Sequence, residues 1–402
     1  MSGINFFVGG FPVLSETFVI NQVAAVVEAG YPSTVVSLMP ETSGAKHQAV
    51  QKLNLIDKRV YVYKSFDKQN RVLGFASALV NDLLSFKFHR LAWIPKAGVK
   101  GYMLGRVFSN VTGPVICHFG PMGADLASLK HLGIVKDVDI ITIFHGYDMT
   151  EYQVIEKYKD AYKVLFQEGK VMLPVNDYFG RKLIELGCEK EKVVTQRMGV
   201  DLSQFSYIER YINTDYSQQD IELICVCRFV EKKGVPVLLK AMAELPVRYK
   251  LTLVGSGELE SDFVELVKSL NLTDRVEMTG ALTSEQVAQR LTKADAFILP
   301  SITAESGDQE GVPVSLMEAM AQGLLVFSSL HSGIPELISN DYSGFLSAEH
   351  DFRHLARQIQ YAFEQLSAEQ RQDIAEHAKD KVESDFNLAK LNQQLVELAN
   401  HL

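Results

Sequence analysis

Short apolar runs alternate with longer segments of helical periodicity along most of the chain. Runs of this kind indicate strands that are buried on both faces, as in parallel sheets flanked by helices. In the first half they are INFFVGG, STVVSLM, PVICHFG, IITIFHG and KVMLPVN, and in the second half IELICVCRF, KLTLVGSG, RVEMTGAL, AFILPS and LVFSSL. The pattern predicts an α/β fold made of two Rossmann-like domains.

A polar stretch of weak periodicity, MGVDLSQFSYIERYINTDYSQQD, separates the two halves. We predict a linker at residues 199–219, between a first domain over residues 1–198 and a second domain over residues 220–380. The last segment, FNLAKLNQQLVELANHL, has apolar residues at helical spacing. It predicts a helix over about residues 381–402.

Composition and charge narrow the class of protein. The chain has 402 residues, which favours two cores over one, and its 47% hydrophobic and 22% charged residues are typical of a globular protein. A formal net charge of −9 argues against general nucleic-acid binding. The start, MSGINFFVGGF, lacks the basic region of a signal peptide, and no apolar run approaches a membrane span. We therefore expect a cytoplasmic protein.

The loops that follow the strands are where a doubly wound fold binds its ligands. In the first half these loops begin with Gly9 and Gly10, with Ser15 soon after, and further along with His145. In the second half they are RFVEKKGV, GSGELE and ITAESGDQEGVPVSLMEAM. Two domains with such loops at facing sheet edges predict a cleft between them.

The basic loop RFVEKKGV places Arg228 and Lys233 beside Gly234 and the start of a predicted helix. Two cations at such a place suit a diphosphate. A solvated charged turn would have the same composition, so this loop alone leaves both interpretations open. GSGELE lacks the third glycine of the dinucleotide-binding pattern and is a weak signal by itself.

The stretch ITAESGDQEGVPVSLMEAM holds four carboxylates and no lysine or arginine. Pro313 suits a first helical residue, so Glu310 is predicted to lie before the helix and Glu318 inside it. Backbone amides from Gly311 to Ser315 would be available to a phosphate, while carboxylates are strong acceptors for sugar hydroxyls. The combination suits a nucleotide sugar. For Glu305 and Asp308, capping of the helix and its dipole is the alternative.

These stretches together resemble the retaining GT-B glycosyltransferases of family 4. RFVEKKGV, LVGSGELE, RVEMTGAL, ADAFILPSITAESGDQEGVPVSLMEAMAQG and HSGIPELI follow the order and spacing of that family, and Glu310 and Glu318 match its E-x7-E motif. In the first half, FPVLSETFVINQ, CHFGPMGADLA and FHGYDM resemble the subgroup that builds bacterial exopolysaccharides, including colanic acid transferases.

The resemblance implies a GT-B fold whose last helix returns to the first domain. It also implies roles for named residues. Arg228 and Lys233 would neutralise the donor diphosphate, Glu310 would contact the donor sugar, and Glu318 would hold the ribose. Catalytic residues would be Lys233, Arg228, Glu310 and His145. The donor would also contact Gly255, Gly257, Leu282, Gly311, Val312, Pro313 and Val314, and the first domain would contribute Gly9, Gly10 and Ser15.

The implied chemistry needs neither cofactor nor metal. Fixed cations would stabilise the leaving diphosphate, and retention would follow from front-face substitution, since no certain nucleophilic carboxylate is evident. DVD at residues 137–139 imitates a metal-binding D-x-D motif. It precedes a predicted strand, however, which places it at the edge of the sheet away from the cleft, where we interpret it as a solvated turn.

Residues 58–106 contain ten lysines and arginines and only two acids, together with Phe86, Phe88 and Trp93. Bases mixed with aromatic residues favour binding to an anionic membrane surface. Ordinary helices with basic solvent-facing sides are the alternative. The resembling subgroup uses lipid-linked acceptors, which supports the membrane interpretation.

We therefore expect transfer of a hexosyl unit from a nucleotide sugar, with UDP as the expected nucleotide, to a polyprenyl-diphosphate-linked or other glycan acceptor. The alternatives are another GT-B enzyme, such as a nucleotide-sugar epimerase or a phosphorylase, and a non-catalytic binding protein. The E-x7-E context disfavours the epimerase, and no region for a phosphorylase cofactor lysine is evident. Retention of Arg228, Lys233, Glu310 and Glu318 disfavours a protein that only binds.

Overall fold

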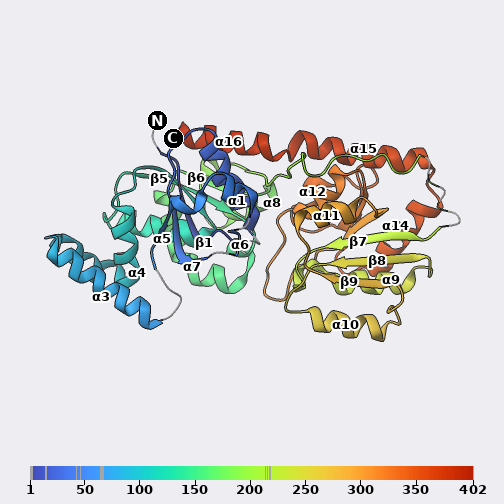
Figure 1. Ribbon diagram of the computed structural model, residues 1–402, viewed down its shortest axis with the longest axis horizontal. Helices are drawn as coiled ribbons and strands as arrows, with labels where there is room; N and C mark the ends of the chain where they lie inside the picture. Colours follow the sequence, from blue (N-terminus) through green and yellow to red (C-terminus); the bar gives the residue numbers. More distant parts are fainter. Residues whose placement is uncertain are drawn as a thin grey trace.

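Two six-stranded parallel sheets form the body of the molecule (Figure 1). The computed structural model describes residues 3–401 except 14–15, 42, 46, 64–67, 213, 215 and 217–218. The strand orders are β3-β2-β1-β4-β5-β6 and β12-β11-β10-β7-β8-β9. Both sheets thus have the doubly wound topology that the apolar runs predict, and together they make a GT-B fold.

The first sheet contains β1 (Asn5–Phe11), β2 (Val35–Pro40), β3 (Arg59–Tyr61), β4 (Gly113–His118), β5 (Val138–Phe144) and β6 (Val171–Pro174). The second contains β7 (Ile221–Val226), β8 (Tyr249–Val254), β9 (Val276–Gly280), β10 (Ala296–Leu299), β11 (Leu325–Ser329) and β12 (Phe345–Ser347). Every predicted run forms a strand. Strands β3 and β12 were not predicted. Each has three residues and lies at a sheet edge, so neither presents a sustained apolar run.

Helices connect the strands and cover the sheets. The first half has α1 (Thr17–Glu28), α2 (Gln48–Lys52), η2 (Leu55–Lys58), α3 (Lys68–Leu84), η3 (Phe88–Ala92), α4 (Trp93–Phe108), α5 (Gly120–His131), α6 (Tyr147–Thr150), α7 (Tyr152–Glu168), α8 (Asp177–Glu185) and η4 (Lys190–Lys192). The second half has η5 (Glu231–Lys233), α9 (Val235–Glu244), α10 (Glu260–Ser269), α11 (Ser284–Leu291), α12 (Val314–Ala321), α13 (Ile334–Leu337), α14 (Phe352–Glu364), α15 (Ala368–Asp385) and α16 (Leu388–Asn400).

Strand β10 shows why the runs do not alternate between apolar and polar residues. All four of its residues are fully buried, because helices cover both faces of the sheet. Each sheet is the centre of its own hydrophobic core, and these two cores hold the loops at the ends of the strands in place.

The C-terminal helices return to the first domain as the resemblance implies. Helix α15 packs against α12, and α16 packs against α1, so the pair runs along one side of both domains (Figure 1). The predicted helix over about residues 381–402 is therefore divided between the end of α15 and α16. At the break, the Val200 amide donates to the Phe386 carbonyl at 2.9 Å, and the Leu388 amide donates to the Val200 carbonyl at 3.1 Å. The two segments in which the chain passes between the domains are thus hydrogen-bonded to each other.

Candidate functional site

The site lies where loops from the two sheets meet, and Glu336 of α13 helps to hold them together. Its carboxylate accepts hydrogen bonds from the backbone amides of Asp177 (3.0 Å) and Tyr178 (2.9 Å), in the first turn of α8. It also lies 3.4 Å from the Arg197 guanidinium. A carboxylate at these amides satisfies helix donors that have no partner within the helix. The domains are thereby joined next to the predicted donor site.

The basic loop is shaped by Gly234, which adopts a left-handed conformation (φ 64°) between η5 and α9. A side chain there would collide with the carbonyl oxygen of Pro300, at the end of β10. The close approach allows the Ile302 amide to donate to the Lys232 carbonyl at 2.9 Å. It brings the lysines of the basic loop against the acidic stretch.

Two lysines of this loop pair with two acids of the stretch. Lys233 forms an ion pair with Glu310, and each of these side chains is only 13% exposed. Lys232 lies 3.0 Å from the Asp308 carboxylate. Burial acts to raise the pKa of Glu310, but Lys233 and Lys232 outweigh it and lower that pKa to about 2. Asp308 is therefore a partner of Lys232, which the capping interpretation did not anticipate.

Glu318 lies in α12 in a contrasting environment. Burial raises its pKa from 4.5 to about 7. The helix begins at Val314, and Pro313 is its N-cap residue, so the prediction of Pro313 as the first helical residue was one position early. Val312 and Pro313 are buried, and Gly311 lies close to the first domain: a side chain there would approach the His145 carbonyl at 3.2 Å.

His145 faces this stretch from the first domain. Its Nε2 lies 3.1 Å from Nδ1 of His118, which is completely buried. Burial lowers the pKa of His118 to about 3 and holds that of His145 well below its usual range, so both rings are neutral at neutral pH. A side chain on the neighbouring Gly146 would approach the Gln309 carbonyl at 2.9 Å. The predicted histidine and the acidic stretch are therefore in direct proximity.

Asp148 supports the turn that carries His145. Its carboxylate is completely buried and accepts from the backbone amides of Gly120 (2.9 Å), Gly146 (2.9 Å) and His145 (3.1 Å). Burial raises its pKa to about 6, despite these hydrogen bonds. Asp148 therefore has a structural role at the turn.

The predicted glycines differ in their surroundings. A side chain on Gly255 would collide with the Cys227 carbonyl, and one on Gly257 would meet the Phe229 backbone at 2.5 Å, so both allow the loop after β8 to pack against the basic loop. Gly9 and Gly10 were predicted in the loop after the first strand, but they lie within the end of β1. Gly9 has open space around its Cα. Leu282 is partly buried against the second core. Ser15 lies outside the described residues.

Arg228 is exposed, and it faces an acid that the sequence analysis did not select. Burial raises the pKa of Glu16 to about 7; Arg228 acts to lower it, and Glu41 to raise it. Glu16 directly precedes α1, after β1. Its position in a loop after a strand was the available signal, but only the structure shows that it faces Arg228 from the other domain.

The motif at residues 137–139 lies at the start of β5, at the end of the sheet opposite His145. This is the predicted edge of the sheet. The interpretation as a solvated turn is correct only for Asp137, because Val138 and Asp139 are the first residues of β5 and Val138 is buried. Within the described part of the chain, no three His, Cys, Asp or Glu side chains are grouped so that they could hold a metal ion.

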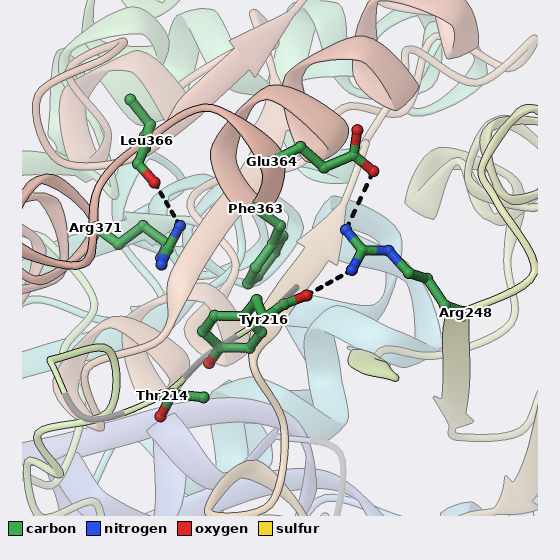
Figure 2. Close-up of a pocket in the computed structure, with 7 residues that line it drawn as sticks. All are labelled: Thr214, Tyr216, Arg248, Phe363, Glu364, Leu366 and Arg371. Atoms are coloured by element: carbon green, nitrogen blue, oxygen red, sulfur yellow. Dashed lines mark hydrogen bonds and ion pairs between the residues drawn. The ribbon is translucent and has the colours of Figure 1, made fainter. Parts of the chain in front are cut away.

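A separate pocket of about 470 Å³ lies on the second domain (Figure 2). It is lined by Thr214, Tyr216, Arg248, Phe363, Glu364, Leu366 and Arg371. Arg248 bonds to the Tyr216 carbonyl at 2.5 Å and to the Glu364 carboxylate at 3.2 Å, and Arg371 bonds to the Leu366 carbonyl at 2.6 Å. Arg248 thus ties the predicted linker to the end of α14, and Arg371 of α15 bonds to the turn between α14 and α15. No predicted site residue lines this pocket.

Known proteins with a similar sequence or structure share this fold. The family described as "Glycosyl transferases group 1" matches residues 213–381. Among solved structures, HepE of Anabaena in complex with UDP-glucose has a TM-score of 0.76 at 15% identity, over 99% of this chain and 100% of that one. A glycosyltransferase of Rickettsia africae has a TM-score of 0.70 at 18% identity, over 100% of this chain and 98% of that one. These two likenesses establish the fold alone.

Two curated relatives match almost the whole chain. The colanic acid biosynthesis glycosyltransferase WcaL of Escherichia coli K12 is 35% identical over 410 residues, covering 99% of this chain and 100% of that protein. The amylovoran biosynthesis glycosyltransferase AmsK of Erwinia amylovora is 34% identical over 412 residues, covering 99% of both. With these full-length matches and the family pattern over its second half, the chain belongs to the group 1 glycosyltransferases.

Proposed function

We propose that this protein moves a hexosyl unit from a UDP-sugar to a lipid-linked oligosaccharide or another glycan acceptor, in the biosynthesis of a bacterial surface polysaccharide. The descriptions of WcaL and AmsK, which name colanic acid and amylovoran, support the pathway class. The complex of HepE with UDP-glucose, a protein of the same fold, supports the donor class.

The observation that carries the proposal is the ion pair between Lys233 and Glu310, beside the turn that holds His145. A nucleotide sugar has a group for each partner. Its diphosphate would attract the Lys233 ammonium, and its sugar hydroxyls would donate to the Glu310 carboxylate. Both side chains are largely buried, so these interactions would be stronger than in water.

The proposed reaction breaks the bond between the anomeric carbon and the diphosphate. Negative charge develops on the leaving diphosphate, where Lys233 and Arg228 would stabilise it by several kcal/mol. The acceptor hydroxyl would attack from the same face, and the leaving phosphate would take its proton, which retains the anomeric configuration. The engagement of Asp148 with three amides and of Glu310 with Lys233 supports this route over a double displacement through a carboxylate.

We further propose that the reaction proceeds without a metal ion. Lys233 and Arg228 supply positive charge at the place where a metal-dependent transferase would use its ion. The largely buried ammonium of Lys233 supports this, because a fixed cation in such a place needs little reorganisation when the diphosphate leaves.

We also propose that α3 and α4 bring the protein to an anionic membrane, at the inner face of the cytoplasmic membrane. The two helices stand out from the first domain on the side away from the second domain (Figure 1). Leu84 (74%), Phe86 (81%) and Phe88 (53%) are exposed there, next to the exposed Lys87. None of the described helices combines the length and the hydrophobicity that a membrane span requires.

Not all bases of residues 58–106 are available to a membrane. Arg90 is buried and lies 3.4 Å from the buried Asp82, which also lies 3.2 Å from Arg106. Lys100 lies 2.5 Å from Asp125. The basic composition thus belongs partly to the internal packing of α3 and α4. Among the side chains that the structure describes in residues 58–106, Lys87 and Lys96 are the exposed bases.

A thermal-shift screen against UDP-, GDP- and ADP-sugars tests the proposed function. A ligand that binds only the native state raises the melting temperature. We expect a UDP-sugar to raise the Tm of the wild type and to have a much smaller effect on Lys233→Ala. A rise with GDP-sugars alone would overturn the choice of UDP, and no rise with any nucleotide sugar would overturn the transferase proposal.

A further inference from the structure

His331 lies directly behind the backbone of Glu310. It follows β11 in the second sheet and is 1% exposed. The backbone amide of Glu310 donates to Nε2 of His331 at 3.0 Å, and Nδ1 of His331 lies 2.7 Å from the Glu349 carboxylate. A buried imidazole thus connects the peptide of the proposed donor-binding acid to a second carboxylate.

These two contacts fix the protonation of the ring. Nε2 must be an unprotonated acceptor because it receives the amide hydrogen of Glu310. The proton of the neutral ring is therefore on Nδ1, which donates to Glu349. Glu349 is itself anchored, since it accepts from the Thr303 amide at 2.8 Å and from the Thr303 hydroxyl at 3.3 Å.

The same chain of hydrogen bonds reaches the first domain. The side-chain amide of Gln309 donates to the Thr303 hydroxyl at 3.3 Å, and the Tyr178 hydroxyl bonds to Gln309 Oε1 at 3.1 Å. Tyr178 is in the first turn of α8, whose amides bind Glu336. An unbroken path of polar contacts thus runs from α8 of the first domain to the peptide of Glu310.

We propose that His331 is a positioning residue for sugar transfer, which holds the Glu310 peptide so that its carboxylate is placed for the donor. This inference rests on the proposed function of Glu310. His331 itself touches neither of the proposed reacting groups. Its Nε2 sets the direction of the Glu310 peptide, Glu349 sets the orientation of the ring, and the contact with Tyr178 makes that orientation depend on the docking of the two domains.

Loss of this acceptor would leave the Glu310 amide without its partner and would allow the loop to move. A displacement of about 1 Å in a positioned group can lower turnover by roughly a hundredfold. Affinity for the free nucleotide would change little, because Lys233 and Glu318 remain in place. Positioning therefore predicts a fall in kcat with little change in the affinity for UDP.

Two substitutions separate positioning from packing. In His331→Gln the side-chain oxygen lies as far along the chain as Nε2, and it can accept from the Glu310 amide. In His331→Asn the side-chain nitrogen takes the place of Nδ1 and can donate to Glu349, but no atom reaches Glu310. We expect kcat to fall less than about fivefold in His331→Gln and about ten- to a hundredfold in His331→Asn. His350→Asn, at an exposed histidine of the same domain, is the control and should match the wild type.

Steady-state transfer kinetics and calorimetry with UDP measure this difference. Equal kcat for the Gln and Asn variants, with both folded by circular dichroism, would overturn the positioning role. If the Asn variant did not fold, Tyr178→Phe would decide: it removes the hydroxyl that contacts Gln309, and we expect a severalfold lower kcat with unchanged UDP affinity. An unchanged kcat in Tyr178→Phe would contradict the proposal. A wild type that binds no nucleotide would refute the proposed function instead.

Discussion

The Lys233 ammonium and the Glu310 carboxylate, from two different loops of the second sheet, form a largely buried ion pair beside His145. Each partner offsets the cost of burying the other's charge, and the pKa of Glu310 is held at about 2 although burial acts to raise it. The pair joins the basic loop after β7 to the acidic stretch before α12. A nucleotide sugar could take over both contacts, one with its diphosphate and one with its hydroxyls.

Glu318 should make the free energy of unfolding depend on pH. Burial raises its pKa from 4.5 to about 7. Below pH 4.5 the carboxyl is neutral in both the folded and the unfolded state, so its contribution to the free energy of unfolding is fully present. This contribution is lost as the pH rises through about 7, because the buried carboxyl then ionises. Glu318→Gln, which is neutral at every pH, should therefore match the wild type at low pH and be more stable at pH 8. The expected gain is on the order of 1 to 2 kcal/mol, because Glu318 is only partly buried.

Urea unfolding of both proteins at pH 4.5 and pH 8 measures this difference. An equal gain in the free energy of unfolding at both pH values would mean that the two proteins differ in packing and not in the ionisation of residue 318. The same variant should bind UDP and a UDP-sugar more weakly by a similar factor, because ribose is common to both. A loss confined to the UDP-sugar would contradict a ribose-binding role for Glu318.

Metal independence gives a second prediction. Because Lys233 and Arg228 would supply the positive charge for the leaving diphosphate, transfer should proceed at an unchanged rate in EDTA. Initial rates before and after chelation, and again after addition of Mg²⁺ or Mn²⁺, test this. Complete loss of transfer in EDTA with recovery on addition of a metal ion would contradict the assignment.

A third prediction concerns the membrane. Replacement of Lys87 and Lys96 by Gln should weaken binding to anionic liposomes by about tenfold or more, since each well-placed base contributes about 1 kcal/mol. High salt should release the wild type. Arg90 and Lys100 are unsuitable for this test because they contact Asp82 and Asp125.

The matched control carries the same charge change on the other domain. Lys240 and Lys293 are exposed residues of the second domain, and their replacement by Gln should leave liposome binding unchanged. Vesicle sedimentation measures all three proteins. Equal binding by the two double variants would show that net charge alone matters and that the tip of α3 and α4 is an ordinary solvated surface.

Much of this architecture could be predicted from the sequence. The runs around β1 and β10 are continuously apolar because both faces of each sheet are covered, so they indicate buried parallel strands directly. Strands β3 and β12 could not be predicted in this way, because an edge strand of three residues has no periodicity to detect. Pro313 was placed one residue too far into the helix, a difference that only the backbone angles can decide.

Individual site residues were harder to assign than the loops that hold them. Lys233 and Glu310 were selected from their loops, but their direct pairing depends on the close approach at Gly234, which the sequence does not reveal. Glu16 and His331 were not selected because their partners, Arg228 and the Glu310 amide, lie far away in the sequence. Contacts between distant segments are set by packing within the second domain and between the two domains, and a local sequence pattern does not reveal them.

In the proposed mechanism, Glu310 binds the donor sugar while Lys233 binds the diphosphate. Glu310→Gln keeps the size of the side chain but removes its charge, and hydrogen bonds to a charged acceptor contribute roughly 1.5 to 3 kcal/mol. The variant should lose most of its transfer rate and still bind UDP nearly as tightly as the wild type. Lys233→Ala should lose both transfer and UDP affinity.

Calorimetric affinity for UDP, measured beside the transfer rate on wild type, Glu310→Gln and Lys233→Ala, tests this claim most directly. We expect a large fall in rate with nearly unchanged UDP affinity for Glu310→Gln, and a fall in both for Lys233→Ala. If Glu310→Gln lost UDP binding as fully as Lys233→Ala, with the fold intact by circular dichroism, Glu310 would serve the diphosphate through Lys233, and its proposed role at the sugar would be wrong.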